Sequence, residues 1–228
     1  MDNRLELIKT LVPQGSRVAD IGADHGRLVV ELVLSGRATG GFACDINRQP
    51  LEKSIKAIRE AGLQQQITPL LCDGLSGLNP EDVDCIVIAG MGGELISAIL
   101  ERSPEFRSRP ELVYLLQPMT KADKLREYLF TKGYDFVAEE CVTEGRFTYT
   151  VIMVRYTGTP HQPTLRETLF GAVTRFDTPD RVLYAKRVLN RLNKKVQGLR
   201  PSGKDAPELH HLIACIEQDI QAGTQRGE

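Results

Sequence analysis

The stretch VADIGADHGRL, residues 18–28, decides how the rest of the chain is interpreted. It begins with an apolar run of strand length, after which Gly22 and Gly26 bracket a turn that leads into a helix-like segment. Strand, glycine turn and helix in this order are typical of α/β proteins that bind a nucleotide at the carboxyl end of a strand. Two carboxylates, Asp20 and Asp24, lie in this turn, where they would repel a bound phosphate.

The segment from residue 17 to about residue 156 alternates strand-like and helix-like stretches, the pattern of a parallel sheet with crossover helices. Two consecutive extended segments follow Gly133 and are joined at Glu144-Gly145, which predicts a closing antiparallel hairpin. We therefore expect an α/β protein with a doubly wound sheet and one reversed edge strand. Strands are predicted at 17–22, 40–46, 67–72, 84–90 and 112–118, and helices near 26–35, 49–61, 92–102 and 121–132.

The proline-punctuated stretch TGTPHQPT, residues 157–164, marks a predicted boundary between a domain of residues 1–157 and a helical domain of residues 158–228. In the helical part, apolar residues recur at heptad spacing on two segments, which predicts an antiparallel helical hairpin or coiled coil. Pairing between two chains is the competing arrangement. The two seams are Val182, Ala185, Leu189, Leu192, Val196 and Leu199, and then Leu209, Ile213, Ile216 and Ile220.

The overall composition is that of a globular protein, with 41% hydrophobic and 26% charged residues. No apolar run reaches the roughly 18–20 residues of a membrane span, and the first residues lack the apolar core of a signal peptide. We therefore expect a cytoplasmic protein without a membrane partner. The five cysteines form no CxxC pair and the four histidines are scattered, so we expect buried thiols and no metal site.

Acidic residues occur at the ends of three successive predicted strands: Asp20 and Asp24, then Asp45, then Asp73. Because parallel strands end at one edge of a sheet, these carboxylates would converge on one crevice. They would repel a dinucleotide's pyrophosphate and attract a cationic cofactor, so the pattern favours S-adenosylmethionine. Asp45 would accept hydrogen bonds from the ribose hydroxyls, and Asp73 from the adenine amino group. Each acid could instead be a helix N-cap.

Four motifs, in chain order, resemble a single family: DIGADHG (20–26), CDGL (72–75), IAGMGG (88–93) and LLQP (115–118), followed by the helical tail. They are similar to the bacterial tRNA adenine-N1-methyltransferases that modify position 22, over nearly the whole chain. The resemblance implies a class I, Rossmann-like methyltransferase fold that uses S-adenosyl-L-methionine, with a C-terminal coiled-coil domain that helps to bind tRNA. One departure is Met119, where the family usually has asparagine.

The resemblance also implies roles for individual residues. Asp24 and His25 are the candidate catalytic residues: Asp24 would stabilise the positive charge of the methylated ring, and His25 would orient a group or accept a proton. The alternative for His25 is a hydrogen bond that stabilises the loop. Expected cofactor contacts are Asp20, Gly22, Gly26, Asp45, Ile46, Asp73, Gly74, Ala89 and Gly90, and expected contacts to the substrate base are Met91, Gly92, Gly93, Gln117 and Pro118.

The AGMGG segment, residues 89–93, occupies the position where many amino-group methyltransferases have an acidic residue or asparagine followed by two prolines. Without that clamp, the chain is better matched to a ring nitrogen such as adenine N1. This atom lies on the Watson–Crick edge, so the target base must be unpaired or extruded from its helix.

A basic stretch suggests how RNA would be bound. Residues 181–204 include no acidic residue but eight basic ones: Arg181, Lys186, Arg187, Arg191, Lys194, Lys195, Arg200 and Lys204. The chain has no tryptophan, seven phenylalanines and six tyrosines, so stacking platforms are scarce. We expect tRNA affinity to come mainly from phosphate contacts of Arg191, Lys194 and Lys195, with a solvated coiled-coil face as the alternative.

The sequence leaves other functions open. The same residues fit a methyltransferase for a small molecule or protein, or a non-catalytic module that binds S-adenosylmethionine. We expect no DNA partner, and a monomer rather than a dimer.

Overall fold

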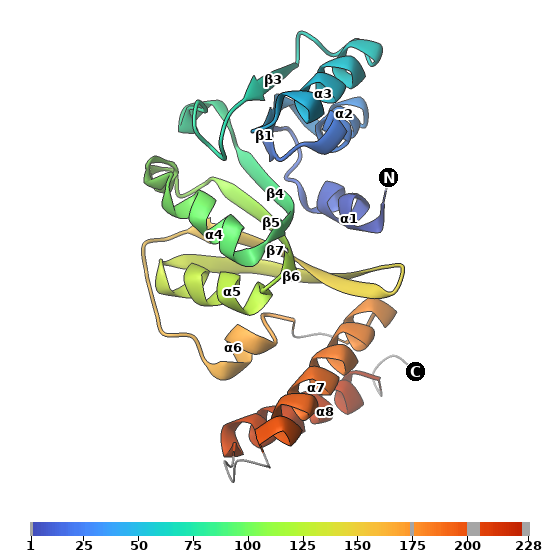
Figure 1. The fold of residues 1–228 in the computed structure, drawn as a ribbon, viewed down its shortest axis with the longest axis vertical. Helices are drawn as coiled ribbons and strands as arrows, with labels where there is room; N and C mark the ends of the chain where they lie inside the picture. The colour runs from blue at the N-terminus through green and yellow to red at the C-terminus, as the bar shows by residue number, and fades with distance from the viewer. Residues whose placement is uncertain (1, 174–175, 200–205, 225–228) are drawn as a thin grey trace.

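The computed structural model describes residues 2–173, 176–199 and 206–224. A seven-stranded sheet forms its larger part, in the order β3-β2-β1-β4-β5-β7-β6 (Figure 1). The order reverses between β1 and β4, so the predicted doubly wound sheet is confirmed. The strands are β1 Ser16–Ile21, β2 Ala38–Asp45, β3 Ile67–Leu71, β4 Cys85–Gly92, β5 Val113–Thr120, β6 Tyr134–Glu144 and β7 Phe147–Tyr156.

The prediction of a reversed edge strand was wrong in one respect. The reversed strand is β7, which pairs antiparallel with both β5 and β6, and the edge strand is therefore β6. The burial of the two strands explains this order. Val151, Ile152 and Val154 of β7 are fully buried, as an interior strand requires. On β6, Val137 is 51% exposed, which an edge strand tolerates.

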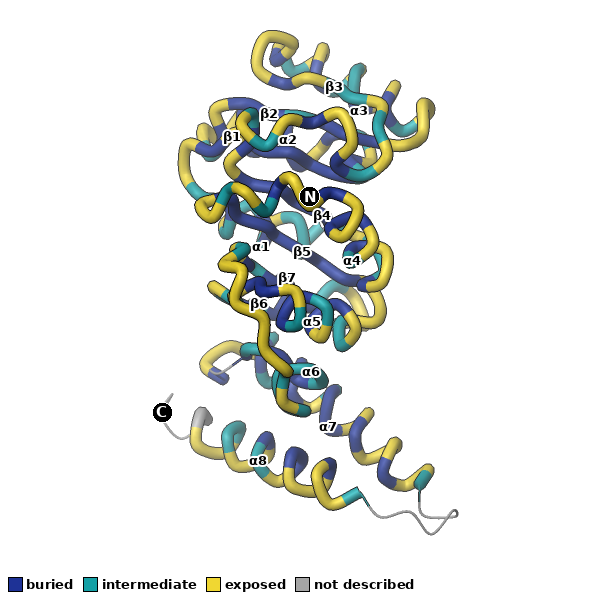
Figure 2. The backbone as a smooth tube through the Cα atoms, turned by 90° about the vertical axis from the view of Figure 1, so that its left-hand side faces the viewer, coloured by how far each residue is buried: buried dark blue, intermediate teal, exposed yellow. Residues whose placement is uncertain are grey.

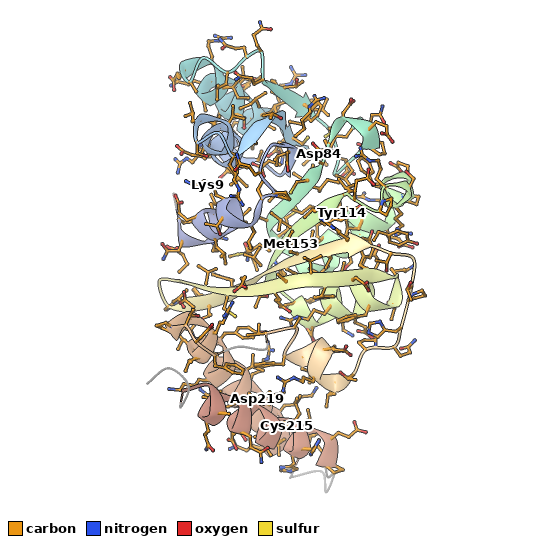
Figure 3. The ribbon with its side chains drawn as sticks, turned by 180° about the vertical axis from the view of Figure 1, so that it is seen from behind. Lys9, Asp84, Tyr114, Met153, Cys215 and Asp219 are labelled. Atoms are coloured by element: carbon orange, nitrogen blue, oxygen red, sulfur yellow. The ribbon has the colours of Figure 1, made fainter. Side chains whose placement is uncertain are left out.

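Helices cover both faces of the sheet and enclose two apolar cores (Figures 1 and 2). One core lies under α1 Asn3–Leu11, α2 Arg27–Leu34 and α3 Arg48–Glu60, and the other under α4 Gly93–Glu101 and α5 Ala122–Thr131. Met153 of β7 packs against the core that contains Ile8 of α1, and Figure 3 shows Met153 near the helix that carries Lys9.

Helix α1 was not predicted from the sequence. It begins at an Asp2 N-cap, whose side chain accepts a hydrogen bond from Leu5 N at 2.9 Å. Its apolar residues are interrupted by charged ones, and only Ile8 is fully buried. Nine residues of this kind gain their stability from packing against the sheet rather than from helix propensity.

The C-terminal part consists of α6 Leu165–Leu169, α7 Pro179–Leu199 and α8 Pro207–Thr224. Helices α7 and α8 fold back on each other as predicted, and the seam residues of each helix form a third core with Phe170, Val173 and Phe176 (Figure 1). Residues 200–205, which lie between the two predicted helices and include Arg200 and Lys204, are outside the described residues. The short helix α6 was not predicted. It begins with a capping box formed by Thr164 and Glu167.

A buried ion pair joins this helical part to the sheet. Arg126 of α5 and Glu139 of β6 are bonded to each other with side chains that are 1% and 0% exposed. Arg126 also donates to Tyr184 Oη of α7 at 2.9 Å, and Glu139 accepts from Ala172 N at 2.8 Å. The third core also includes Cys141 of β6.

The domain boundary between residues 157 and 158 stays a prediction. No described helix is long and apolar enough to cross a membrane.

Candidate functional site

A pocket of about 520 Å³ opens at the carboxyl ends of β1 and β4, where the strand order reverses. This volume lies in the range of small-molecule and cofactor sites. Three segments line most of it: the glycine loop after β1, the residues at the end of β4, and the first turn of α1. The lining residues that matter below are Arg4, Asp20, Gly22, Asp24, His25, Ala89, Gly90, Met91 and Met119.

The glycine loop is held by backbone hydrogen bonds to the neighbouring strand. Gly22 N and Ala23 N both donate to Cys44 O, at 2.9 and 3.0 Å. Gly22 has a φ of +74°, and a Cβ on this residue would lie 2.4 Å from Met91 Cε. Gly26 has a φ of +63°, and a Cβ there would lie 3.0 Å from Ser54 Cβ. Both predicted glycines are therefore required by the turn and by close packing.

Asp20 and Asp45 lie side by side at the ends of β1 and β2, and both are buried, with 6% and 8% exposure. Burial, followed by the negative charge of Asp45, raises the pKa of Asp20 to about 7. Asp45 Oδ1 accepts from Asn47 N at 2.8 Å, whereas within the described ranges the carboxylate of Asp20 has no hydrogen-bond donor. A ligand with a positive charge or hydrogen-bond donors would stabilise the ionised carboxylate of Asp20 if it bound in the pocket.

Asp24 and His25 stand at the pocket wall and contact each other, with Asp24 Oδ1 3.2 Å from His25 Nε2. Their side chains are 75% and 37% exposed. His25 has a φ of +66°, an uncommon conformation for a residue with a side chain. Such strain is often found at functional sites, and here it places both side chains at the pocket.

The expected adenine-binding segment has a different environment. Asp73 forms a two-pronged ion pair with Arg102, at 3.0 and 3.1 Å, and its side chain is half exposed outside the pocket lining. Gly74 packs against Ile99, where a Cβ would lie 3.0 Å from its Cγ2. Ile46 follows β2 with 60% exposure. Their roles as cofactor contacts stay predictions.

The glycine-rich segment at the end of β4 divides into two parts. Ala89, Gly90 and Met91 line the pocket. Gly92 is instead the N-cap of α4, and Gly93 faces α5, where a Cβ would lie 2.3 Å from Lys121 O. The small size of Gly93 is thus explained by helix packing.

Gln117 is fully buried behind the pocket and connects its walls. Its Oε1 accepts from Gly90 N at 3.1 Å and from Arg4 Nη1 at 3.2 Å. Gln117 therefore contacts two residues that both line the pocket, and its expected contact to the substrate base stays a prediction. Pro118, the next residue, pairs with Met91 in the sheet and is not part of the lining.

Arg4 is one of the pocket-lining residues that were not predicted from the sequence. Its Nη1 lies 3.0 Å from Met119 Sδ, its Nη2 donates to Asp2 Oδ2 at 2.7 Å, and its guanidinium lies over the ring of Tyr149 at 5.5 Å. No local spacing connects residue 4 with residues 117 and 119. Only the folded chain brings them together, so no signal in the sequence could have found Arg4.

The predicted RNA-binding residues lie on α7, away from the pocket lining (Figure 1). Arg191, Lys194 and Lys195 are exposed, and Arg191 donates to Leu169 O at 3.2 Å. Arg181, from the same basic stretch, is buried and paired with Glu140 and Asp177. It therefore belongs to the docking of α7 rather than to an exposed basic surface.

The strand order with a single reversed strand, the glycine loop after β1 and the acids at the ends of β1 and β2 together define a class I methyltransferase. Residues 1–152 match the family model described as a methyltransferase domain, and the chain belongs to this family.

Known relatives extend the similarity beyond that domain. The tRNA (adenine(22)-N(1))-methyltransferase of Bacillus subtilis is 33% identical over 153 residues, which are 67% of this chain and 64% of that protein. A candidate tRNA methyltransferase of Mycoplasma pneumoniae is 29% identical over 95% of this chain and its own full length. The crystal structure of a candidate tRNA (m1A22) methyltransferase of Streptococcus pneumoniae, in complex with S-adenosyl-L-methionine, covers 96% of this chain and 99% of its own at 27% identity, with a TM-score of 0.80.

Proposed function

We infer that this chain transfers a methyl group from S-adenosyl-L-methionine to N1 of an adenosine in tRNA, at position 22. One observation carries the inference: the pocket at the switch point contains the buried carboxylate of Asp20 beside Asp45, without a donor among the residues that the structure describes. Such a site favours a cationic ligand. The acceptor is inferred from the relatives above, which are tRNA methyltransferases or candidates for that activity.

The cofactor would be held by the residues around the glycine loop. Bound S-adenosyl-L-methionine supplies a methyl group on a positively charged sulfur. Asp20 and Asp45 provide acceptors at the strand ends, Gly22 and Gly26 allow close approach of the backbone, and Ile46 offers an apolar surface. Asp73, Gly74, Ala89 and Gly90 complete the proposed contacts.

The chain's part in the reaction is mainly positioning, because adenine N1 attacks with its own lone pair and needs no base beforehand. Asp24, at the pocket wall, would stabilise the positive charge that the ring gains. His25, 3.2 Å from that carboxylate, would hold it in place. Met91 would contact the face of the base, while Gln117 fixes the loop through its bond from Gly90 N.

The helical part would bind the body of the tRNA through the exposed Arg191, Lys194 and Lys195 of α7.

We also propose that the protein is a monomer, because the apolar seams of α7 and α8 cover each other within one chain. The proposed location is the cytoplasm.

The reaction is tested with two unmodified tRNA transcripts that differ only in carrying adenosine or guanosine at position 22. We expect label from S-adenosyl-L-methionine only in the first, recovered as N1-methyladenosine after nucleoside analysis. Label in both transcripts would contradict the site. Label in neither, with cofactor binding intact, would favour another acceptor or a binding module.

The role of α7 is tested by changing Arg191, Lys194 and Lys195 to glutamate together. We expect a higher KM for tRNA and a shallower dependence on salt, because each lost phosphate contact removes about 0.7–0.9 from the log–log slope. Cofactor affinity should not change.

The matched control changes Lys53, Lys56 and Arg59 to glutamate. These residues are exposed on α3, at the other end of the molecule (Figure 1). Equal increases in KM for both triple variants would show a general charge effect and contradict a specific role of α7.

A further inference from the structure

The tip of the β6–β7 hairpin carries an exposed aromatic side chain. Phe147 is 50% exposed and belongs to none of the three apolar cores of the described chain. The guanidinium of Arg146, which is also exposed, lies over its ring at 5.1 Å. Packing in the folded chain therefore does not account for an aromatic residue at this position.

These two residues continue a line of side chains that ends in the pocket. Phe147 and Tyr149 alternate along β7 and so point to the same face, with ring centroids 6.2 Å apart. The guanidinium of Arg4 lies 5.5 Å from the Tyr149 ring centroid, and Arg4 lines the pocket beside Met119. We call Arg146, Phe147, Tyr149 and Arg4 the arginine–aromatic strip.

Hydrogen bonds between α1 and the hairpin, next to the hairpin tip, hold the strip in place. Asn3 N donates to Glu144 Oε2 at 2.8 Å, and Asn3 Nδ2 donates to Thr143 O at 3.0 Å. Helix α1 packs on both β6 and β7, and α7 also packs on this hairpin (Figure 1). The strip thus lies between the pocket and the beginning of the helix proposed to bind the tRNA body.

The chemistry of the strip fits unpaired nucleotides. Aromatic faces stack on bases without regard to their sequence, and guanidinium groups bind phosphates and stack on rings. A target base that leaves its stack to enter the pocket also exposes the faces of its neighbours. The charges are complementary as well, since the acids lie inside the pocket and the arginines along the approach to it.

We propose that the arginine–aromatic strip binds the unpaired nucleotides next to the target adenosine, with Phe147 as a stacking platform and Arg146 and Arg4 facing the backbone. The inference rests on the proposed function and assigns it an RNA-binding surface separate from α7. The composition suggested that stacking platforms are scarce, but one of the few aromatic side chains, Phe147, is exposed, and it contacts the half-buried Tyr149 next to Arg4 of the pocket lining.

The first test measures KM for the tRNA transcript at saturating cofactor. We expect Phe147→Ala to raise KM about 5- to 150-fold, the effect of losing one base–aromatic stack. Phe147→Tyr should retain the wild-type KM, whereas Phe147→Leu, which keeps apolar area without an aromatic face, should behave like the alanine variant. Cofactor affinity, measured by calorimetry, should be the same in all three variants.

The matched controls lie at the other end of the same hairpin. Val137→Ala removes an apolar side chain of 51% exposure, and Arg155→Ala removes an exposed arginine for comparison with Arg146→Ala. We expect both controls to retain the wild-type KM. A KM that rises equally in Val137→Ala and Phe147→Ala would overturn the proposal.

The second test reports stacking directly. A transcript carries 2-aminopurine immediately 3′ of the target, and a second transcript carries it immediately 5′. We expect the wild-type protein to alter the fluorescence of at least one of them, and Phe147→Ala to lose that change. Sedimentation velocity of both proteins is measured alongside. A dimer that Phe147→Ala disrupts, with KM and fluorescence unchanged, would overturn the proposal in favour of a contact between two chains.

The two inferences fail in different ways. If the wild-type protein methylates no tRNA, the proposed function fails whatever the variants do. If the wild-type protein methylates the adenosine transcript and Phe147→Ala retains both its KM and its fluorescence change, only the role of the strip is refuted.

Discussion

Asp20→Asn is expected to abolish binding of S-adenosyl-L-methionine and, at the same time, to stabilise the ligand-free protein. Burial and the charge of Asp45 raise the pKa of Asp20 to about 7 from an ordinary value of 3.8. Above pH 7 an ionised carboxylate in this position destabilises the folded state by up to roughly 4 kcal/mol. Asparagine keeps the shape of the side chain and removes that charge, so we expect a gain of roughly 2–4 kcal/mol at pH 8.

The pH dependence has a definite sign. A carboxyl whose pKa is raised on folding contributes its full stability below its unfolded pKa and loses it as the pH rises towards its folded pKa. For Asp20 this window runs from about pH 4 to pH 7. The gain from Asp20→Asn in the free energy of unfolding should therefore be larger at pH 8 than at pH 5.5, measured by urea denaturation. If Asp20→Asn raised the free energy of unfolding equally at both pH values, or lowered it, the folded state would not raise the pKa of Asp20.

Cofactor binding by the wild-type protein should follow the same titration. A cationic ligand favours the ionised form of Asp20, so binding below pH 7 must release a proton. We expect the association constant to fall about tenfold per pH unit below pH 7 and to be constant above it. Calorimetry in buffers of different ionisation enthalpy would measure the released proton. Asp24→Asn, which changes an exposed carboxylate of the same loop, is the control and should leave the free energy of unfolding nearly unchanged.

Glu139→Ala is expected to give the second large effect, a loss of about 3–5 kcal/mol in the free energy of unfolding. The substitution leaves the guanidinium of Arg126 buried without its counter-charge. It also removes the acceptor for Ala172 N, so the segment that leads to α7 loses its anchor on β6. Urea denaturation would measure the loss, and limited proteolysis would report whether the helical part detaches.

Two variants test the cause of that loss. Glu127→Ala breaks an exposed pair with Lys124 on the same helix, α5, and should change the free energy of unfolding by less than about 0.5 kcal/mol. Replacing Arg126 with methionine and Glu139 with leucine together removes both charges, and should recover much of the stability that Glu139→Ala loses. A double variant no more stable than Glu139→Ala would show that the pair's hydrogen bonds, rather than its unmatched charge, dominate.

Regular structure was predicted well where a local pattern repeats. All five parallel strands, and the helices that follow the first, second, fourth and fifth of them, begin and end within two residues of their predicted limits. The apolar residues at heptad spacing predicted α7 and α8 correctly, because an apolar helix face is buried as soon as a second helix with such a face packs against it. Helices α1 and α6 were missed, since nine and five residues are too few for a clear periodic signal.

The candidate site was predicted in part. Asp20, Gly22, Asp24, His25 and Met91 were expected at the cofactor or substrate site, and all of them line the pocket. Asp73 follows the third strand as expected, but the structure pairs it with Arg102. The sequence could not show that pairing, because Arg102 lies 29 residues further on and reaches Asp73 only through the packing of α4.

The sequence by itself determined the elements that depend on neighbours along the chain: the strand–turn–helix units, the glycine loop and the paired seams of the tail. Only the tertiary structure decided the position of β7 inside the sheet, the burial of Arg181 and the place of Arg4 at the pocket. The physical reason is the range of the interactions. A turn or a helix is specified by residues a few positions apart, whereas the charge state of Asp20 and the surroundings of Arg4 depend on contacts that exist only after distant segments have packed.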